Sequence, residues 1–198
     1  MSDEKRQYRM KRRAEQEAET RLRITESAVD LHGTLGPART SVSAIAEHAG
    51  VRRSTVYRHF PDERALFGAC SAHWAESNPP PDVGGWQTID EPDARLDAAL
   101  AELYAYYRQT EDMLNGLLRD APAVPVVDEL MGAFRAMLSE ATDVLMGGRG
   151  LRGASRERTR AAIGHALAFS TWQDLTRTQG LDDTRAAELA SRLVAAAG

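Results

Sequence analysis

Basic and hydroxyl side chains gather in one short stretch, residues 40–60, with the sequence TSVSAIAEHAGVRRSTVYRHF. Its second half carries polar or basic residues that share one face at helical spacing: Arg53, Ser54, Tyr57 and Arg58. An arginine can donate two hydrogen bonds to guanine O6 and N7, and hydroxyl groups can donate to phosphate oxygens. This pattern therefore predicts a helix that reads duplex DNA.

The first half of the stretch predicts a helix over residues 43–49. Its apolar positions recur at helical spacing: Ile45, Ala46 and Ala49. Either Thr40 or Ser41 can supply the N-cap oxygen. Gly50 follows, where a helix end favours a left-handed backbone. We therefore expect a tight turn between two short helices.

The second helix is expected over residues 52–60, with Val56 and Phe60 on its inner face. Arg52 and Arg53 fall at its N-terminus, where the helix dipole disfavours cations. An external polyanion would offset that cost, and the whole spacing fits a helix-turn-helix. The alternative is a surface hairpin whose arginines are merely solvated.

The stretch also resembles the TetR family of bacterial repressors. Four segments carry the resemblance, which covers residues 24–67: TSV at 40–42, IAEHAGV at 45–51, TVYRHF at 55–60 and PDERALF at 61–67. Where the family usually has Lys two residues after the proline, this chain has Glu63, so the resemblance leaves that phosphate contact in doubt.

The resemblance and the helix position together give two sets of DNA-contacting residues. Arg53 and Ser54, with Arg52 as a weaker candidate, are expected to contact bases because they begin the second helix. The residues expected at phosphates match the family's phosphate-contacting positions or carry a basic group beside them: Thr40, Thr55, Tyr57, Arg58 and His59.

Charge is unevenly distributed along the 198 residues. Residues 1–60 hold twelve Lys or Arg against eight Asp or Glu, a net +4, whereas the remainder holds thirteen against twenty-one, a net −8. A basic first third on an acidic body is typical of a nucleic-acid reader with a separate second domain. Chance clustering is the alternative, although the motif falls in the same third.

Composition limits the class of protein. A hydrophobic fraction of 42% suffices for a core, and no run of eighteen apolar residues predicts a membrane span. The charged N-terminus lacks a secretory signal, and the single cysteine, Cys70, excludes an internal disulfide. We therefore expect a cytoplasmic protein.

We expect an all-α fold with three parts: a disordered basic arm over 1–13, a helix-turn-helix domain over 14–61, and a helical ligand-binding and dimerisation domain over 62–198. The arm could follow DNA or could simply be a solubilising tail. A linker is expected over 78–85. Further helices are expected over 15–32, 61–77, 92–109, 111–119, 126–146, 155–178 and 181–197.

Catalytic signatures are missing from the sequence. It contains no GxGxxG, P-loop, HExxH or GxSxG pattern, and its five histidines are scattered without metal-binding spacing. We therefore expect no enzyme activity, no cofactor and no metal.

Large apolar and aromatic side chains recur at helical spacing in the body. The resemblance implies an inducer cavity there, and the candidate ligand-binding residues are Tyr104, Met113, Phe134, Met137, His165, Phe169 and Trp172. Few charges lie among them, so a small apolar or aromatic effector is expected. Ordinary core packing is the alternative for any single residue.

The last two helices carry many small residues, which permit close approach of helices. The resemblance places a homodimer interface there, and a dimer doubles the contact with a palindromic operator. The sequence thus indicates a repressor released from DNA by a ligand. The alternatives are a helical ligand-binding protein or enzyme with an incidental basic region, and a nucleoid-like binder without sequence preference.

Overall fold

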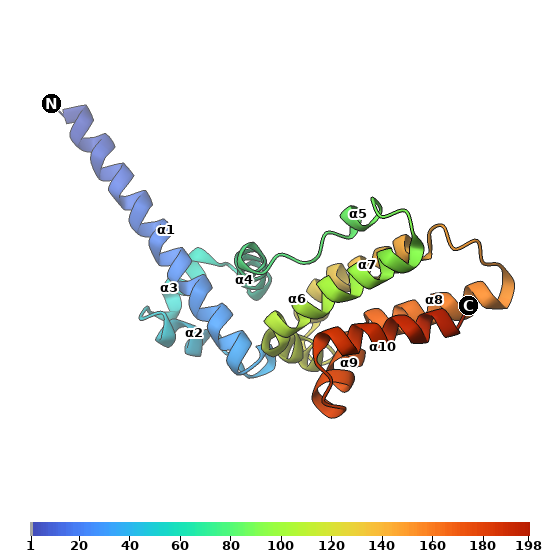
Figure 1. Ribbon diagram of the computed structural model, residues 1–198. Helices are drawn as coiled ribbons and strands as arrows, with labels where there is room; N and C mark the ends of the chain where they lie inside the picture. The colour runs from blue at the N-terminus through green and yellow to red at the C-terminus, as the bar shows by residue number, and fades with distance from the viewer. Residues whose placement is uncertain (1) are drawn as a thin grey trace. The chain divides into compact units, whose positions relative to one another are not determined.

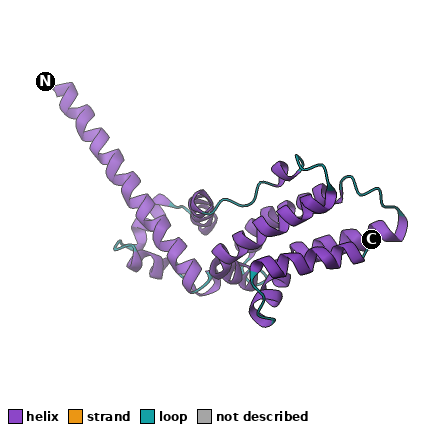
Figure 2. Cartoon of the chain, viewed as in Figure 1, coloured by secondary structure: helices purple, strands orange, loops and turns teal. Residues whose placement is uncertain are grey.

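The structure is a computed structural model that describes residues 2–198. That part of the chain is all-α, and no strand occurs in it (Figure 2). The predicted fold class is therefore confirmed. The chain divides into two compact units, the first made of Met1–Ser77 with Asp112–Leu130 and the second of Asn78–Glu111 with Met131–Gly198.

Helix α1 spans Ser2–Thr34, so the predicted helix over 15–32 begins much earlier than expected (Figure 1). Residues 2–13, expected to be disordered, form its first turns. Their residue types explain this, because Glu, Lys, Arg, Gln and Met are good helix formers. Arg13 also pairs with Glu17 one turn on, at 3.3 Å.

The first unit also contains α2 (Val42–His48), α3 (Arg53–His59) and α4 (Glu63–Ser77). Apolar side chains from these helices and from α1 form one core: Ile24, Ala28, Ile45, Ala46, Ala49, Val56, Phe60, Leu66 and Cys70. Leu22, on the same helix α1, is 46% exposed and stays outside this core. The core thus fixes α2 and α3 against the C-terminal half of α1.

The start of α4 differs from its predicted position at Pro61. The backbone N–H of Ala65 donates to the carboxylate of Asp62 at 2.8 Å, so Asp62 caps the helix and Pro61 stays outside it.

In the linker after α4, a short helix, α5, spans Val83–Trp86. The next helix, α6, is continuous over Pro92–Asp120, whereas apolar spacing predicted two helices, over 92–109 and 111–119. The polar Thr110 interrupts the apolar pattern of the sequence, but the backbone remains helical through it. Its hydroxyl donates to the carbonyl of Tyr106 at 2.7 Å, a bond that helices tolerate.

Helix α7 spans Pro125–Met146 and ends before the glycine-rich residues 147–150. Gly148 and Gly150 both have positive φ there. Arg95, which is 8% exposed, donates to the carbonyls of Val144 and Gly147 at 3.1 and 3.0 Å. A buried arginine therefore holds the C-terminal end of α7, where the carbonyl of Val144 also accepts the backbone N–H of Gly147 at 3.1 Å.

The predicted helix over 155–178 is divided into α8 (Gly153–Leu167), α9 (Phe169–Gln173) and a π-helical segment (Asp174–Thr178). The chain leaves the helical conformation at Ala168, where ψ is 135°. The hydroxyls of Tyr104 and Tyr107 donate to the carbonyls of Ala166 and Leu167 at 2.9 and 2.6 Å. These hydrogen bonds between residues far apart in sequence stabilise the break between α8 and α9, and no local sequence pattern predicts them.

Helix α10 spans Asp183–Ala196 and closes the second unit. Its N-cap is Asp182, whose carboxylate accepts the backbone N–H of Arg185 at 2.9 Å.

Candidate nucleic-acid interface

The turn between α2 and α3 has the predicted helix-turn-helix geometry. The Ser41 hydroxyl accepts the backbone N–H of Ala44 at 3.1 Å, so Ser41 rather than Thr40 caps α2. Gly50 has φ 65°, and the N–H of Val51 donates to the carbonyl of Ala46 at 2.9 Å. This hydrogen-bonded turn fixes the direction in which α3 leaves.

Helix α3 has one buried and one exposed face. Val56 lies inside it and Phe60 directly follows it, and both are 1% exposed. The exposed residues are those predicted to reach bases or phosphates at its beginning and along its outer face: Arg52, Arg53, Ser54, Tyr57 and Arg58. The core thus turns the predicted outer face toward solvent.

Two of these residues contact each other. Arg53 Nη2 donates to the Tyr57 hydroxyl at 3.0 Å, and its guanidinium lies 5.4 Å from the centre of the Tyr57 ring. Because the hydroxyl accepts this bond, its own proton remains available for a phosphate oxygen. Arg53 can therefore contact a base while Tyr57 donates a hydrogen bond to a neighbouring phosphate.

The predicted phosphate contacts differ in accessibility. Thr40 is half-buried, and its hydroxyl is within bonding distance of the carbonyls of Gly36 at 2.8 Å and Leu31 at 3.3 Å. A phosphate contact from this hydroxyl would require its proton to turn away from both. Thr55 is also half-buried, on the flank of α3.

His59 is half-buried at the end of α3. Its Nε2 has no hydrogen-bond partner within residues 2–198. Burial lowers the pKa of His59 below its ordinary value, and the positive charges of Arg58 and Arg21 lower it further. This favours the neutral imidazole. Because Nε2 itself is buried, a hydrogen bond to a phosphate requires donation from Nδ1 or a rotation of the ring.

No pattern in the sequence predicted a role for Arg21. Its guanidinium lies 4.2 Å from the centre of the Phe60 ring, and Nη1 donates to the carbonyl of His59 at 2.7 Å. It therefore supports the C-terminal end of α3 from α1. The two partners are thirty-eight positions apart in sequence, and no local pattern joins them.

At Glu63 the chain departs from the pattern of the family, and the next residue, Arg64, has an ionic partner. Arg64 forms a bidentate ion pair with Glu129 in the same unit. This pair raises the pKa of Arg64 and lowers that of Glu129. Arg64 is therefore held by a carboxylate in the absence of DNA.

Asp120, at the end of α6, holds the turn that precedes α2. Its Oδ2 accepts the backbone N–H of Ala38 at 2.9 Å, and Arg119 donates to its Oδ1 at 2.6 Å. Arg119 also donates to the carbonyl of Leu35 at 3.3 Å. These bonds fix the loop through which the chain passes from α1 to α2.

In the second unit, four predicted ligand-binding residues lie close to Tyr107, which is fully buried. Its ring centre lies 6.3 Å from that of Tyr104, 6.4 Å from Phe134, 5.2 Å from Phe169 and 5.9 Å from Trp172. Burial raises the pKa of Tyr104 and Tyr107, so both hydroxyls stay protonated.

The other three candidates lie elsewhere. Met113 belongs to the first unit, where a Cβ on Gly33 would lie 3.5 Å from its methyl carbon. Met137 is half-buried on α7. His165 is exposed and lines an open pocket of about 360 Å³ with residues of α8 and α10 that include Ala162 and Leu193.

Helices α8 and α10 both carry small or apolar side chains on parts of their surfaces. Ala166, Ala186 and Ala190 are at most 3% exposed, so they pack within the unit. Leu189 and Leu193 are 38% and 57% exposed on α10. Such leucines on a helix surface are available to a partner.

Other kinds of site find no support in the described chain. Within residues 2–198, no three His, Cys, Asp or Glu side chains are placed to hold a metal ion. No helix in that range has the length and apolar character needed to cross a membrane.

Comparison with known proteins agrees with the geometry of the first unit. Residues 24–70 match the family described as bacterial regulatory proteins, tetR family. The HTH-type transcriptional regulator AcrR of Shigella flexneri is 44% identical over 59 residues, which are 29% of this chain and 27% of that protein. The chain thus spans about a quarter of the curated relative that it matches.

Solved structures resemble the fold over a longer range. A candidate fatty acid metabolism regulator from Clostridium perfringens superposes with a TM-score of 0.63 at 15% identity, covering 89% of this chain and 98% of that one. NalD, the secondary repressor of the MexAB-OprM multidrug efflux pump in Pseudomonas aeruginosa, gives 0.59 at 17% identity, covering 92% and 96%. At these identities the likeness concerns the fold alone.

Proposed function

We propose that the chain is a sequence-specific transcriptional repressor of the TetR family, to whose description residues 24–70 match. The proposal assigns DNA binding to residues 14–61, with residues 62–198 as the ligand-binding and dimerisation domain. The observation that carries it is the outer face of α3, where arginine and hydroxyl groups are exposed over a buried apolar face.

Arg53 and Ser54 are assigned to bases, with Arg52 beside them. Arg53 and Ser54 occupy the first turn of α3, the part of a recognition helix that contacts base edges in the major groove. Tyr57, Arg58 and His59 are assigned to the phosphates on either side. Thr55 is a candidate for the same role, and so is Thr40 once its hydroxyl proton turns away from the carbonyls of Gly36 and Leu31.

The experiment begins with selection of duplexes from a random 30-base-pair pool by the full chain, followed by titration of the selected duplex. Arg53→Ala should weaken the selected duplex by about 1–3 kcal/mol and relax one base position. Arg135→Ala, at an exposed arginine on α7, serves as the matched control. Equal loss on every sequence with Arg53→Ala would contradict base reading.

A homodimer through α8 and α10 is the second part of the proposal. Two recognition helices must lie about 34–36 Å apart to read adjacent major grooves of a palindrome, which requires a fixed two-fold pairing. The exposed Leu189 and Leu193 support α10 as part of that pairing. Leu193→Asp should therefore give monomers in analytical ultracentrifugation.

The control for that experiment is Leu118→Asp, which introduces the same charge at another exposed leucine, on α6, with an exposed fraction of 37% against 57% for Leu193. A dimer that persists in Leu193→Asp, or a monomer produced equally by Leu118→Asp, would place the pairing elsewhere.

The third part is a small apolar or aromatic effector that binds among the rings around Tyr107 and releases DNA. A ligand can shift an equilibrium only by its differential affinity for two conformations. Phe134 is the half-buried member of the cluster, so it can be changed with the least damage to packing. A panel of uncharged aromatic compounds should be screened for thermal stabilisation and for release of the selected duplex.

With any releasing compound, Phe134→Ala should raise the concentration needed for release while the affinity for DNA without the compound stays unchanged. A panel in which no compound both stabilises the protein and releases DNA would leave a constitutive DNA binder. Proportional loss of DNA affinity in Phe134→Ala would mean that the residue supports folding rather than the effector.

A further inference from the structure

The N-terminal part of α1 is a helix without packing partners in its unit. Every side chain from residue 4 to residue 19 is exposed. Residues 4–13 hold six basic side chains against the single carboxylate of Glu4, a net charge of +5. Apart from the pair of Arg13 with Glu17, no described ion pair involves a basic side chain of this segment.

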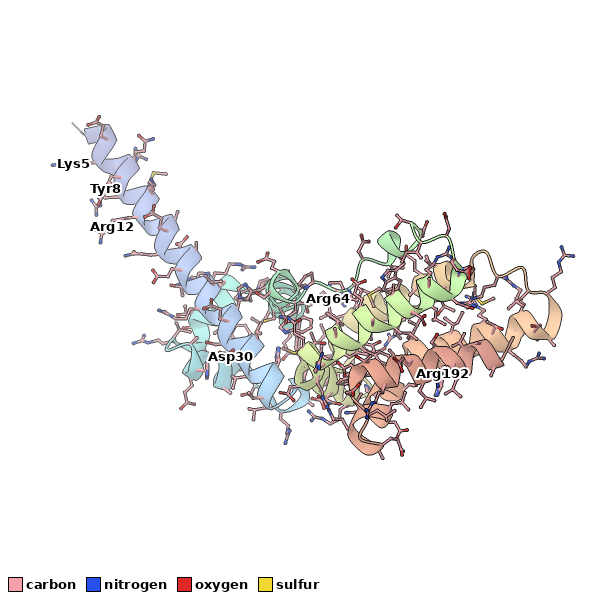
Figure 3. All side chains as sticks on the ribbon, in the orientation of Figure 1. Lys5, Tyr8, Arg12, Asp30, Arg64 and Arg192 are labelled. Carbon is pink, nitrogen blue, oxygen red and sulfur yellow. The ribbon has the colours of Figure 1, made fainter. Side chains whose placement is uncertain are left out.

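The basic residues are concentrated on one face. At 100° per residue, five of the six fall within an arc of about 120°: Lys5, Arg6, Arg9, Arg12 and Arg13. Figure 3 shows Lys5 and Arg12 projecting from the same side of α1. Lys11 lies on the opposite side of the helix. We call the five residues the basic face of α1.

This arrangement does not favour the helix itself. Arg9 has like-charged neighbours one turn before it at Lys5 and one turn after it at Arg13. Each such pair costs an isolated helix about 0.2–0.5 kcal/mol. Only Arg13 has a described carboxylate partner, Glu17. A row of repelling cations on a free helical face is relieved by an anion from outside the chain.

We propose that the basic face of α1 binds the phosphate backbone of duplex DNA beside the base pairs that α3 reads. This inference rests on the proposed function, and it adds a second contact surface to it. The C-terminal half of α1 packs against α2 and α3, so the basic face and the recognition helix belong to one unit. From Arg21, which holds the end of α3, Lys5 lies about 24 Å along the helix.

The helical form of the segment determines how it contacts DNA. An α-helix with its side chains is about 10–12 Å wide, whereas the minor groove of B-DNA is about 6 Å wide. The segment therefore does not enter the minor groove as an extended arm would. Lysine and arginine side chains instead reach phosphate oxygens from outside, which gives affinity without sequence preference.

The test measures affinity against salt concentration for two duplexes, the selected 30-base-pair duplex and a mixed-sequence duplex of equal length. Arg9→Gln removes one charge from the basic face, and Lys11→Gln removes one from the opposite side as a matched control. Glutamine keeps a similar helix propensity, and circular dichroism checks that helix content is unchanged.

The slope of log affinity against log salt should become shallower by about 0.9 in Arg9→Gln and stay unchanged in Lys11→Gln. The triple variant Lys5→Gln, Arg9→Gln, Arg12→Gln should lose about 2.7 in slope on both duplexes alike, with the preference for the selected duplex retained.

Three outcomes would overturn the inference. An unchanged slope in the triple variant would show a face that does not contact DNA, and equal changes in Arg9→Gln and Lys11→Gln would show an effect of net charge alone. A loss of dimer in the triple variant would show a protein contact instead. If the unaltered chain selects no duplex, the proposed function itself fails, and that result is distinguishable from all three.

Discussion

Arg53 and Tyr57 form one unit on the outer face of α3, because Arg53 Nη2 donates to the Tyr57 hydroxyl at 3.0 Å. The contact restricts the arginine rotamer before DNA is bound, which reduces the entropy lost on contacting a base. It also leaves the hydroxyl proton of Tyr57 for a phosphate. Base reading and phosphate binding are thus linked through one side-chain hydrogen bond.

This link predicts non-additive effects on DNA affinity. Arg53→Ala and Tyr57→Phe should each weaken the selected duplex. The double variant should lose less than the sum of the two, with a coupling of about 0.5–3 kcal/mol. Tyr57→Phe should also weaken mixed-sequence duplexes, because the phosphate donor is lost. Titration of both duplexes with the three variants provides the measurement, and strictly additive losses would mean that the two residues act separately.

The second prediction concerns the break between α8 and α9. Tyr107→Phe removes a buried hydroxyl that donates to the carbonyl of Leu167, so the carbonyl loses its partner. The free energy of unfolding should fall by about 1–3 kcal/mol. Tyr106→Phe, at a neighbouring half-buried tyrosine, should change it far less. Urea denaturation measures the free energy of unfolding of both variants. An equal loss in Tyr107→Phe and Tyr106→Phe would contradict a special role for the Tyr107 hydroxyl.

The helix-turn-helix could be predicted closely because its signals are local. Apolar spacing placed Val56 and Phe60 inside, and Gly50 took the left-handed conformation expected from its position. The contact of Arg21 with the end of α3, and the tyrosine bonds at the α8 break, join residues far apart in sequence. Periodicity carries no information about such pairs.

The candidate ligand residues show the same limit. Side-chain type and helical spacing selected Phe169 and Trp172 as ligand candidates, and the structure places both next to Tyr107. The same reasoning could not assign Met113 to the other unit or leave His165 exposed, because helical spacing indicates which face is apolar but not which helix will cover it.

The third prediction concerns Asp120. The hydrogen bond from Arg119 and the N–H of Ala38 lower the pKa of this carboxyl below its ordinary value. Its stabilising contribution is therefore present above the unfolded pKa, about 3.9, and is lost as the pH falls through the lower folded value. At pH 7, Asp120→Ala should cost about 1–3 kcal/mol in urea denaturation.

Asp120→Asn should cost less than Asp120→Ala, since the amide oxygen can still accept the N–H of Ala38 while the ion pair with Arg119 is lost. Asp112→Ala, at an exposed carboxylate on the same helix, should have little effect. Equal losses from Asp120→Ala and Asp112→Ala would mean that the turn before α2 is held by other contacts.

The fourth prediction is a dependence of stability on pH through His32. This histidine is 4% exposed and stacks on Phe67 with ring centres 4.5 Å apart, and burial lowers its pKa to about 4. Between about pH 6.5 and pH 4 the unfolded chain binds a proton that the folded chain excludes, so stability falls as the medium is acidified. The slope approaches about 1.4 kcal/mol per pH unit.

His32→Phe keeps a ring against Phe67 but cannot titrate. The difference in unfolding free energy between this variant and the unaltered chain should therefore change with that slope from pH 6.5 to pH 5. His48→Phe, at an exposed histidine of the same unit, should leave the pH dependence unchanged. Parallel pH profiles for the unaltered chain and His32→Phe would show that the imidazole becomes protonated without unfolding, through a rearrangement around Phe67.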